Sequence, residues 1–180
     1  MINLDRMMLM RKAQHVLRFH TVPTLHRQNV GEHTFGVLSI LLEVWPSAGT
    51  ELIKAALYHD APEAVVGDTP SPALREFGIL KDGVGIAESV VRNKYGLHTT
   101  LTVQDEKVLR FCDIMECMIF CLEEWYRGNK TALIMAERAE EYIRSAGLHK
   151  ISTEAETLFT MYTVKLIRGS ESEGESDARE

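Results

Sequence analysis

Residues 103–126 have the sequence VQDEKVLRFCDIMECMIFCLEEWY. Apolar side chains occupy most sides of this segment, at positions Val108, Leu109, Phe111, Ile114, Met115, Met118, Ile119 and Leu122. A helix that is apolar nearly all round is covered by its neighbours, so we expect this one at the centre of the fold. Thr102, which directly precedes it, is suited to cap its N-terminus.

The rest of the chain also has helical periodicity, and no stretch alternates over a useful length as a strand would. We predict further helices over residues 4–17, 31–45, 50–61, 84–95, 130–145 and 153–167. The segment PEAVVGDTPSP (62–72) contains prolines and a glycine, which predict a fixed loop. The predicted fold is all-α, a compact bundle of about six to seven helices.

The chain has 180 residues and 45% apolar content, which suits one domain with a buried core. We assign that domain to residues 1–168. The segment 169–180 is too acidic and polar to bury anything, so we predict that it is disordered. It carries five acids and one arginine, so it accounts for −4 of the net charge of −6. The rest of the chain is close to neutral, which excludes a protein that binds nucleic-acid polymers.

Two further features bear on location. No stretch approaches the roughly 20 apolar residues needed to span a bilayer, so we expect no membrane association. Cys112, Cys117 and Cys121 recur at near-helical spacing, as small core residues do in a reducing compartment. We therefore expect a cytoplasmic protein.

Polar groups capable of metal chemistry interrupt the apolar helices. His59 and Asp60 end the apolar run AALYHD, His33 lies in NVGEHTFGVL, and Asp113 lies inside RFCDIMECMIF. A buried acid or imidazole requires a partner or a cation. The alternative for Asp113 is an ion pair with an arginine or lysine, such as Arg18 or Arg110. A lone His-Asp pair can simply cap a helix. Four such groups together favour a metal site.

Two imidazoles and two carboxylates form a mixed nitrogen and oxygen ligand set. This set suits Mn, Fe, Co, Ni or Zn, and it suits Mg less well. Four protein ligands leave room for water on a five- or six-coordinate ion, and bound water of lowered pKa is a nucleophile at neutral pH. We therefore expect hydrolysis of a phosphate ester.

Other charged residues could complete such a site. Glu63 follows Asp60 by three positions, so on a continued helix it would share the face of His59 and Asp60. Asp68 lies in the proline-rich loop. For both, an ordinary surface or turn acid is the alternative. Arg18, Lys81 and Arg110 are candidates for phosphate binding, with surface charge as the alternative.

Taken together, these strings resemble the HD-domain phosphohydrolases. More narrowly, the chain is similar to the bacterial 5′-deoxynucleotidases and the phage deoxynucleoside triphosphohydrolases, including those specific for dATP. The matching strings are Arg18-Phe19, NVGEH (29–33), HDAPE (59–63), GDTPSP (67–72), CDIMEC (112–117) and CLEE (121–124).

The resemblance implies a helical fold and a homo-oligomer, a dimer or a hexamer, in a bacterial or phage-infected cell. It implies metal ligation by His33, His59, Asp60 and Asp113. It also implies catalytic roles for Glu63 and Asp68, and both catalysis and substrate binding for Arg18.

Three positions depart from the family pattern. Phe19 stands where tryptophan is usual, in a position whose ring is expected to pack on the nucleotide and help to exclude a ribose 2′-hydroxyl. Pro62 disfavours helix at the preceding residue, so Glu63 can begin a new turn. Gly31 replaces a small polar residue, which predicts a slightly weaker helix cap.

The predicted reaction is attack of an activated water on the α-phosphorus of a 2′-deoxynucleotide, with release of the deoxynucleoside. We slightly favour a triphosphate substrate, because Lys81 and Arg110 can add positive charge and because only 53 positions separate Asp60 from Asp113. The alternative is a 5′-deoxynucleotidase acting on monophosphates. A hydrolase of cyclic nucleotides or guanosine tetraphosphate, and a non-catalytic nucleotide sensor, are further alternatives.

Overall fold

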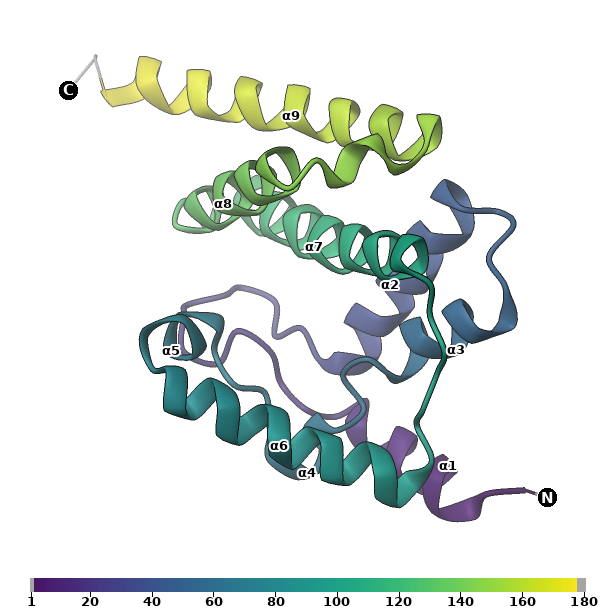
Figure 1. The fold of residues 1–180 in the computed structure, drawn as a ribbon. Coiled ribbons are helices and arrows are strands. Elements are labelled where there is room, and N and C mark those ends of the chain that lie inside the picture. Colours follow the sequence, from purple (N-terminus) through teal and green to yellow (C-terminus); the bar gives the residue numbers. More distant parts are fainter. Residues whose placement is uncertain (1, 178–180) are drawn as a thin grey trace. The chain divides into compact units, whose positions relative to one another are not determined.

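The computed structural model describes residues 2–177, and the side chains of residues 2–166. These residues form nine α-helices and one short 3₁₀ helix, without a strand among them, so the predicted all-α fold is confirmed (Figure 1). The chain divides into two compact units, which are described separately. The first comprises Met1–Pro23, Arg27–Gly36 and Gly49–Leu101, and the second comprises Thr24–His26, Val37–Ala48 and Thr102–Glu180. The single domain over residues 1–168 therefore stays a prediction.

The first unit contains most of the short helices. They are α1 (Leu4–Ala13), the start of α2 (Val30–Val44), α3 (Thr50–Tyr58), α4 (Glu63–Val66), α5 (Ser71–Glu76) and α6 (Gly78–Tyr95). The prediction that residues 62–72 form only a loop was wrong, because α4 and α5 lie within or begin in this segment. Proline is tolerated at such helix starts, where no intrahelical N–H bond is lost. Pro62 caps α4, and Pro72 lies in the first turn of α5.

A small apolar core holds the first unit together. Its buried members are Leu9, Ala13, Val30, Ala61, Ala64, Val91 and Leu97. These residues come from α1, α2, α4, α6 and the turns beside them. Ala61 directly follows the His-Asp pair in sequence, so this core fixes the backbone on which the pair is carried.

The N-terminus of α2 has a cap that the sequence interpretation did not anticipate. Asn29 Oδ1 accepts a hydrogen bond from Glu32 N at 3.0 Å, and Glu32 Oε2 accepts one from Asn29 N at 3.1 Å. This reciprocal pair is a capping box. Gly31 lies within this box and allows close packing, since a Cβ there would lie 2.9 Å from Gln14 Cβ.

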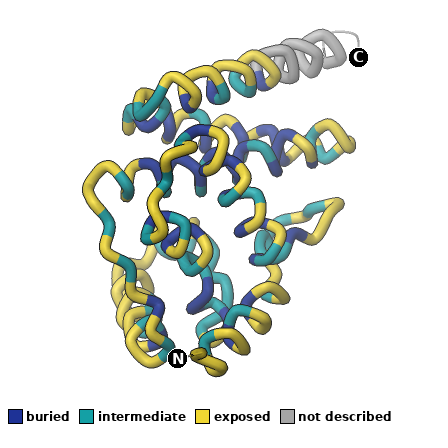
Figure 2. Tube along the Cα trace, turned by 90° about the vertical axis from the view of Figure 1, so that its right-hand side faces the viewer, coloured by how far each residue is buried: buried dark blue, intermediate teal, exposed yellow. Residues whose placement is uncertain are grey.

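The second unit contains the rest of α2 together with α7 (Val103–Tyr126), α8 (Ala132–Ser145), a 3₁₀ helix (Leu148–Ile151) and α9 (Thr153–Asp177). Thr102 caps α7 as predicted, since Thr102 Oγ1 accepts from Asp105 N at 3.1 Å and Asp105 Oδ2 accepts from Thr102 N at 3.0 Å. α7 contributes ten buried residues, which confirms its predicted burial. Buried positions occur in both units (Figure 2).

Glu124, near the end of α7, is fully buried. Its carboxylate accepts hydrogen bonds from Leu25 N at 2.5 Å, His26 N at 2.8 Å and Asn129 Nδ2 at 3.1 Å. Burial alone would raise the pKa of Glu124, but these hydrogen bonds hold it below its ordinary value. Glu124 therefore anchors the segment Thr24–His26 within the second unit.

Two predictions concern the chain as a whole. The backbone of α9 continues to Asp177, through most of the segment for which we predicted disorder, and no proline interrupts it there. Residues 178–180 of that segment lie outside the described residues. Across the described part of the chain, every helix is too short or too polar to cross a membrane.

Candidate metal centre

His59 and Asp60 lie where α3 ends. α3 stops at Tyr58, His59 is its C-cap, and Pro62 prevents the helix from continuing in register. The Nδ1 atom of His59 lies 2.7 Å from the carbonyl oxygen of Ala56. An Nδ1–H that donates to this carbonyl leaves the Nε2 lone pair for a ligand.

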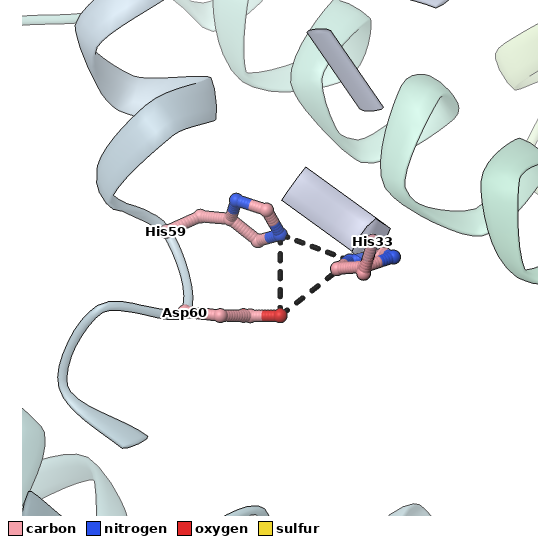
Figure 3. Close-up of side chains that lie close together, drawn as sticks. All are labelled: His33, His59 and Asp60. Carbon is pink, nitrogen blue, oxygen red and sulfur yellow. Dashed lines mark hydrogen bonds and ion pairs between the residues drawn. The ribbon is translucent and has the colours of Figure 1, made fainter. Parts of the chain in front are cut away.

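The predicted ligands His33, His59 and Asp60 form a compact triangle in the first unit (Figure 3). The Nε2 atoms of the two imidazoles are 3.1 Å apart. Asp60 Oδ2 lies 3.3 Å from His59 Nε2 and 3.5 Å from His33 Nε2. His33 is fully buried, so its imidazole is held within the fold by its surroundings.

These distances fit a divalent ion. Protein nitrogen and oxygen ligands lie about 2.0 to 2.2 Å from zinc, so neighbouring ligands of one ion are separated by roughly 3.0 to 3.5 Å. The three separations in the triangle all fall in this range. Two imidazoles and a carboxylate also have the donor chemistry that zinc and similar transition metals prefer. The divalent-metal site predicted from sequence is therefore supported.

Arg18 lies beside Asp60. Its Nη1 atom donates to Asp60 Oδ2 at 3.1 Å, and both side chains are largely shielded from solvent. Burial alone would raise the pKa of Asp60, but the neighbouring His59, His33 and Arg18 hold it well below its ordinary range. The backbone N–H of Arg18 donates to the carbonyl of Gln28 at 2.9 Å, which fixes the segment that carries the arginine.

Phe19, the adjacent residue, has a left-handed backbone conformation with φ of 55°. It is the only non-glycine residue with positive φ in the described chain. Such a conformation is costly for an aromatic residue and often occurs at functional sites. The guanidinium of Arg18 lies 5.7 Å from the centre of the Phe19 ring, so these two predicted substrate-binding residues contact one another.

Glu63 begins α4, so it does not share one continuous helix with His59 and Asp60. Its Oε2 atom is buried without a hydrogen-bond partner in the described structure. Burial, reinforced by the charges of Asp60 and Asp68, raises the pKa of Glu63 to about 8. An unpartnered buried carboxyl group is costly, which indicates that a further group or water belongs beside it.

Asp68 lies in the loop between α4 and α5. Its Oδ2 atom is 3.3 Å from Nδ1 of His20, a contact that the sequence interpretation did not predict. The two residues are 48 positions apart, so no local pattern marks the pair.

Three further residues were predicted for the site, Asp113, Arg110 and Lys81. Asp113 lies on α7 of the second unit, where its Oδ2 atom is 3.0 Å from Arg110 Nη1. Arg110 also donates from Nε to the hydroxyl of Tyr142 at 3.3 Å. Of the two arginines considered as ion-pair partners of Asp113, Arg110 forms the pair, while Arg18 pairs with Asp60. Lys81 is exposed on α6 of the first unit.

Comparison with known proteins places this geometry in a family context. The sequence model of the HD-domain family matches residues 10–93, which include His33, His59 and Asp60. Residues 10–93 are therefore similar to the HD domain, in agreement with the resemblance that the sequence motifs indicated.

Related sequences occur in several phages. A dATP triphosphohydrolase of Cyanophage S-2L is 28% identical over 116 residues, covering 61% of this chain and 65% of the relative. The chain thus spans just under two thirds of that relative. A dATP triphosphohydrolase of Acinetobacter phage SH-Ab 15497 is 29% identical over 157 residues, covering 75% of this chain and 74% of the relative. The predicted resemblance to phage deoxynucleoside triphosphohydrolases is confirmed.

Solved structures share the fold. The Cyanophage S-2L HD phosphohydrolase DatZ, bound to dA and one catalytic Zn²⁺ ion, has a TM-score of 0.63 at 20% identity, with 89% of this chain and 96% of that chain covered. A protein of Pyrococcus horikoshii OT3 has a TM-score of 0.69 at 21% identity, with 90% and 99% covered. Both likenesses concern the fold, which this chain shares over about nine tenths of its length.

Proposed function

Because residues 10–93 are similar to the HD domain and contain a preformed metal-ligand triangle, we propose that the protein is a metal-dependent deoxynucleoside triphosphate triphosphohydrolase. The observation that carries the proposal is the set of mutual distances between His33 Nε2, His59 Nε2 and Asp60 Oδ2. The similarity to phage dATP triphosphohydrolases supports the choice of substrate and favours dATP among the deoxynucleotides.

Asp113 is the proposed fourth ligand. Support comes from its motif, CDIMEC, and from its position on a helix with ten buried residues. We expect Asp113→Asn to lower metal affinity in the full-length protein. Glu123→Gln, an exposed change on the same helix, is the control and should leave affinity unchanged.

A divalent ion held by these residues would lower the pKa of a bound water and so supply a nucleophile near neutral pH. Glu63 accepts a proton from the attacking water, since it lies buried beside Asp60 and lacks another hydrogen-bond partner in the described structure. The positive charge of a bound ion would lower the raised pKa of Glu63 and so make its carboxylate form available as a base.

Two further side chains act on the substrate. Arg18 binds phosphoryl oxygens and stabilises the charge that develops on them. Water attacks the α-phosphorus and the bond to the 5′-oxygen breaks. Asp68, in its protonated form, donates the proton that this oxygen takes up. His20, at 3.3 Å, holds Asp68 in place. The products are a deoxynucleoside and triphosphate.

The strained backbone at Phe19 supports a role for its ring against the nucleotide. Phe19 can stack on a base or sugar but has no N–H with which to bond the sugar edge. Lys81 and Arg110 are proposed to add positive charge for the outer phosphates. The pair with Asp113 orients Arg110, and the exposure of Lys81 leaves it able to reach a ligand.

The test is a substrate panel with metal-loaded protein. dATP, dAMP, ATP and AMP are incubated separately and nucleoside release is measured by chromatography. Fastest release from dATP supports the proposal. Fastest release from dAMP would identify a 5′-deoxynucleotidase instead, and nucleotide binding without any product would indicate a sensor.

Assembly and location complete the proposal. We expect a homo-oligomer, a dimer or a hexamer, in the cytoplasm of a bacterial or phage-infected cell. Light scattering of the purified chain measures the mass directly, and a monomeric mass at micromolar concentration would contradict the first expectation.

A further inference from the structure

The C-terminus of α3 carries a contact from a distant helix. Arg92, in the last turn of α6, donates from Nη2 to the carbonyl of His59 at 2.6 Å and from Nη1 to the carbonyl of Tyr58 at 3.3 Å. The last carbonyls of a helix have no intrahelical partner, so an external donor satisfies them. A cation there also complements the negative end of the helix dipole.

The carbonyl of His59 belongs to the peptide that joins the two candidate ligands. A peptide unit is planar and includes the Cα atoms of both residues that it joins. A group that fixes the His59 carbonyl therefore fixes the plane from which the side chains of His59 and Asp60 both depart. No other residue pair in the triangle is linked in this way, because His33 lies on α2.

Arg92 is itself held in place. Val91, its neighbour, is buried in the same apolar core as Ala61, which follows Asp60. Glu88 lies one helical turn earlier, with Oε2 3.6 Å from Arg92 Nη2. The Arg92 side chain is 31% exposed, so it is partly shielded from water at the contact. Core packing and the ion pair thus aim the guanidinium at the end of α3.

The chemistry favours arginine over lysine at this position. Two successive carbonyls accept from two nitrogens of one planar guanidinium. A lysine ammonium is a single point charge without this fork, so it cannot reproduce both bonds with the same geometry.

We propose that Arg92 is a positioning residue that orients the His59–Asp60 peptide for metal binding, acting through the backbone carbonyl of His59. The inference rests on the metal site of the proposed function. Residues that orient metal ligands typically change metal affinity by about 10- to 100-fold when they are removed.

The test measures metal binding by the full-length, metal-free protein. Co²⁺ is titrated in and followed by its visible absorption, and Zn²⁺ affinity is obtained by competition. We expect Arg92→Ala to lower affinity by about 10-fold or more and to alter the Co²⁺ spectrum, with Arg92→Lys intermediate. Lys94→Ala, an exposed cation on the same helix, is the control and should match the wild type.

Each outcome is decisive. If both Arg92 variants bind metal with wild-type affinity and spectrum, the positioning role is wrong while the metal site stands. If the wild type itself binds no divalent ion, the metal site of the proposed function fails and the inference fails with it. If Arg92→Ala does not fold, as judged by circular dichroism, Arg92→Lys decides: wild-type behaviour overturns the inference, and weaker binding supports it.

Discussion

The Nε2 atoms of His33 and His59 are 3.1 Å apart, although His33 lies on α2, His59 follows the end of α3, and 26 positions separate them. Two neutral imidazoles offer at most one donor–acceptor bond across this separation, whereas a shared cation satisfies both lone pairs. The first prediction follows from this relationship. His59→Ala should lose stoichiometric metal binding in the full-length protein, measured by elemental analysis after dialysis.

Metal removal should also destabilise the wild type, because a ligand that binds only the folded state adds to its stability. Chelation should lower the melting temperature, and Zn²⁺ or Mn²⁺ should restore it. His59→Ala should show no such response. If neither chelator nor metal changes the melting temperature of the wild type, the proposed metal site is contradicted.

Glu63→Gln should remove a proton acceptor while retaining the size of the side chain. We expect turnover to fall by about 10²- to 10⁴-fold, the usual range for loss of general acid–base catalysis. Metal content should stay near that of the wild type, since Glu63 is not a proposed ligand. Wild-type turnover by this variant would exclude Glu63 as the base.

Gly31→Ala tests the close approach of α2 to the residue that follows α1. The added Cβ would lie 2.9 Å from Gln14 Cβ and 3.1 Å from Asn29 Oδ1, so the backbone has to shift. We expect a loss of about 1 to 3 kcal/mol in the free energy of unfolding, measured in urea. Gly83→Ala is the control, because a Cβ at Gly83 meets nothing within 4 Å. Equal stability of the two variants would contradict the packing argument.

Glu124 gives a prediction about pH. Its pKa is lowered in the folded protein, so its stabilising effect is present above the unfolded value of 4.5 and is lost as pH falls through the folded value. Glu124→Gln should cost about 1 to 3 kcal/mol at pH 7, because it disturbs a buried carboxylate with several donors. The difference from wild type should shrink toward pH 3. Glu123→Gln, an exposed neighbour, should have little effect at any pH.

Much of this architecture could be predicted from the sequence, because apolar periodicity and capping residues act locally. The burial of α7 and its Thr102 cap follow from local patterns. The candidate ligands stand in two separate short strings, His33 in NVGEH and His59 with Asp60 in HDAPE. The cluster of His33, His59 and Asp60 could be predicted, because polar groups at the ends of apolar helices require partners.

Other features depend on tertiary approach and could not be predicted. Arg92 has the sequence context of an ordinary surface arginine, and only the packing of α6 brings it to the end of α3. The sequence does not show that Gly31 lies against Gln14, a residue 17 positions earlier in the chain. His20 and Asp68 are paired through the fold, not through a motif.

The measurement that bears most directly on the central claim is hydrolysis of dATP in ¹⁸O-labelled water by the metal-loaded protein, with products identified by mass spectrometry. We expect deoxyadenosine without label and triphosphate carrying one ¹⁸O atom, because water attacks the α-phosphorus. Label in the deoxyadenosine, or release of pyrophosphate or orthophosphate as the first product, would contradict it.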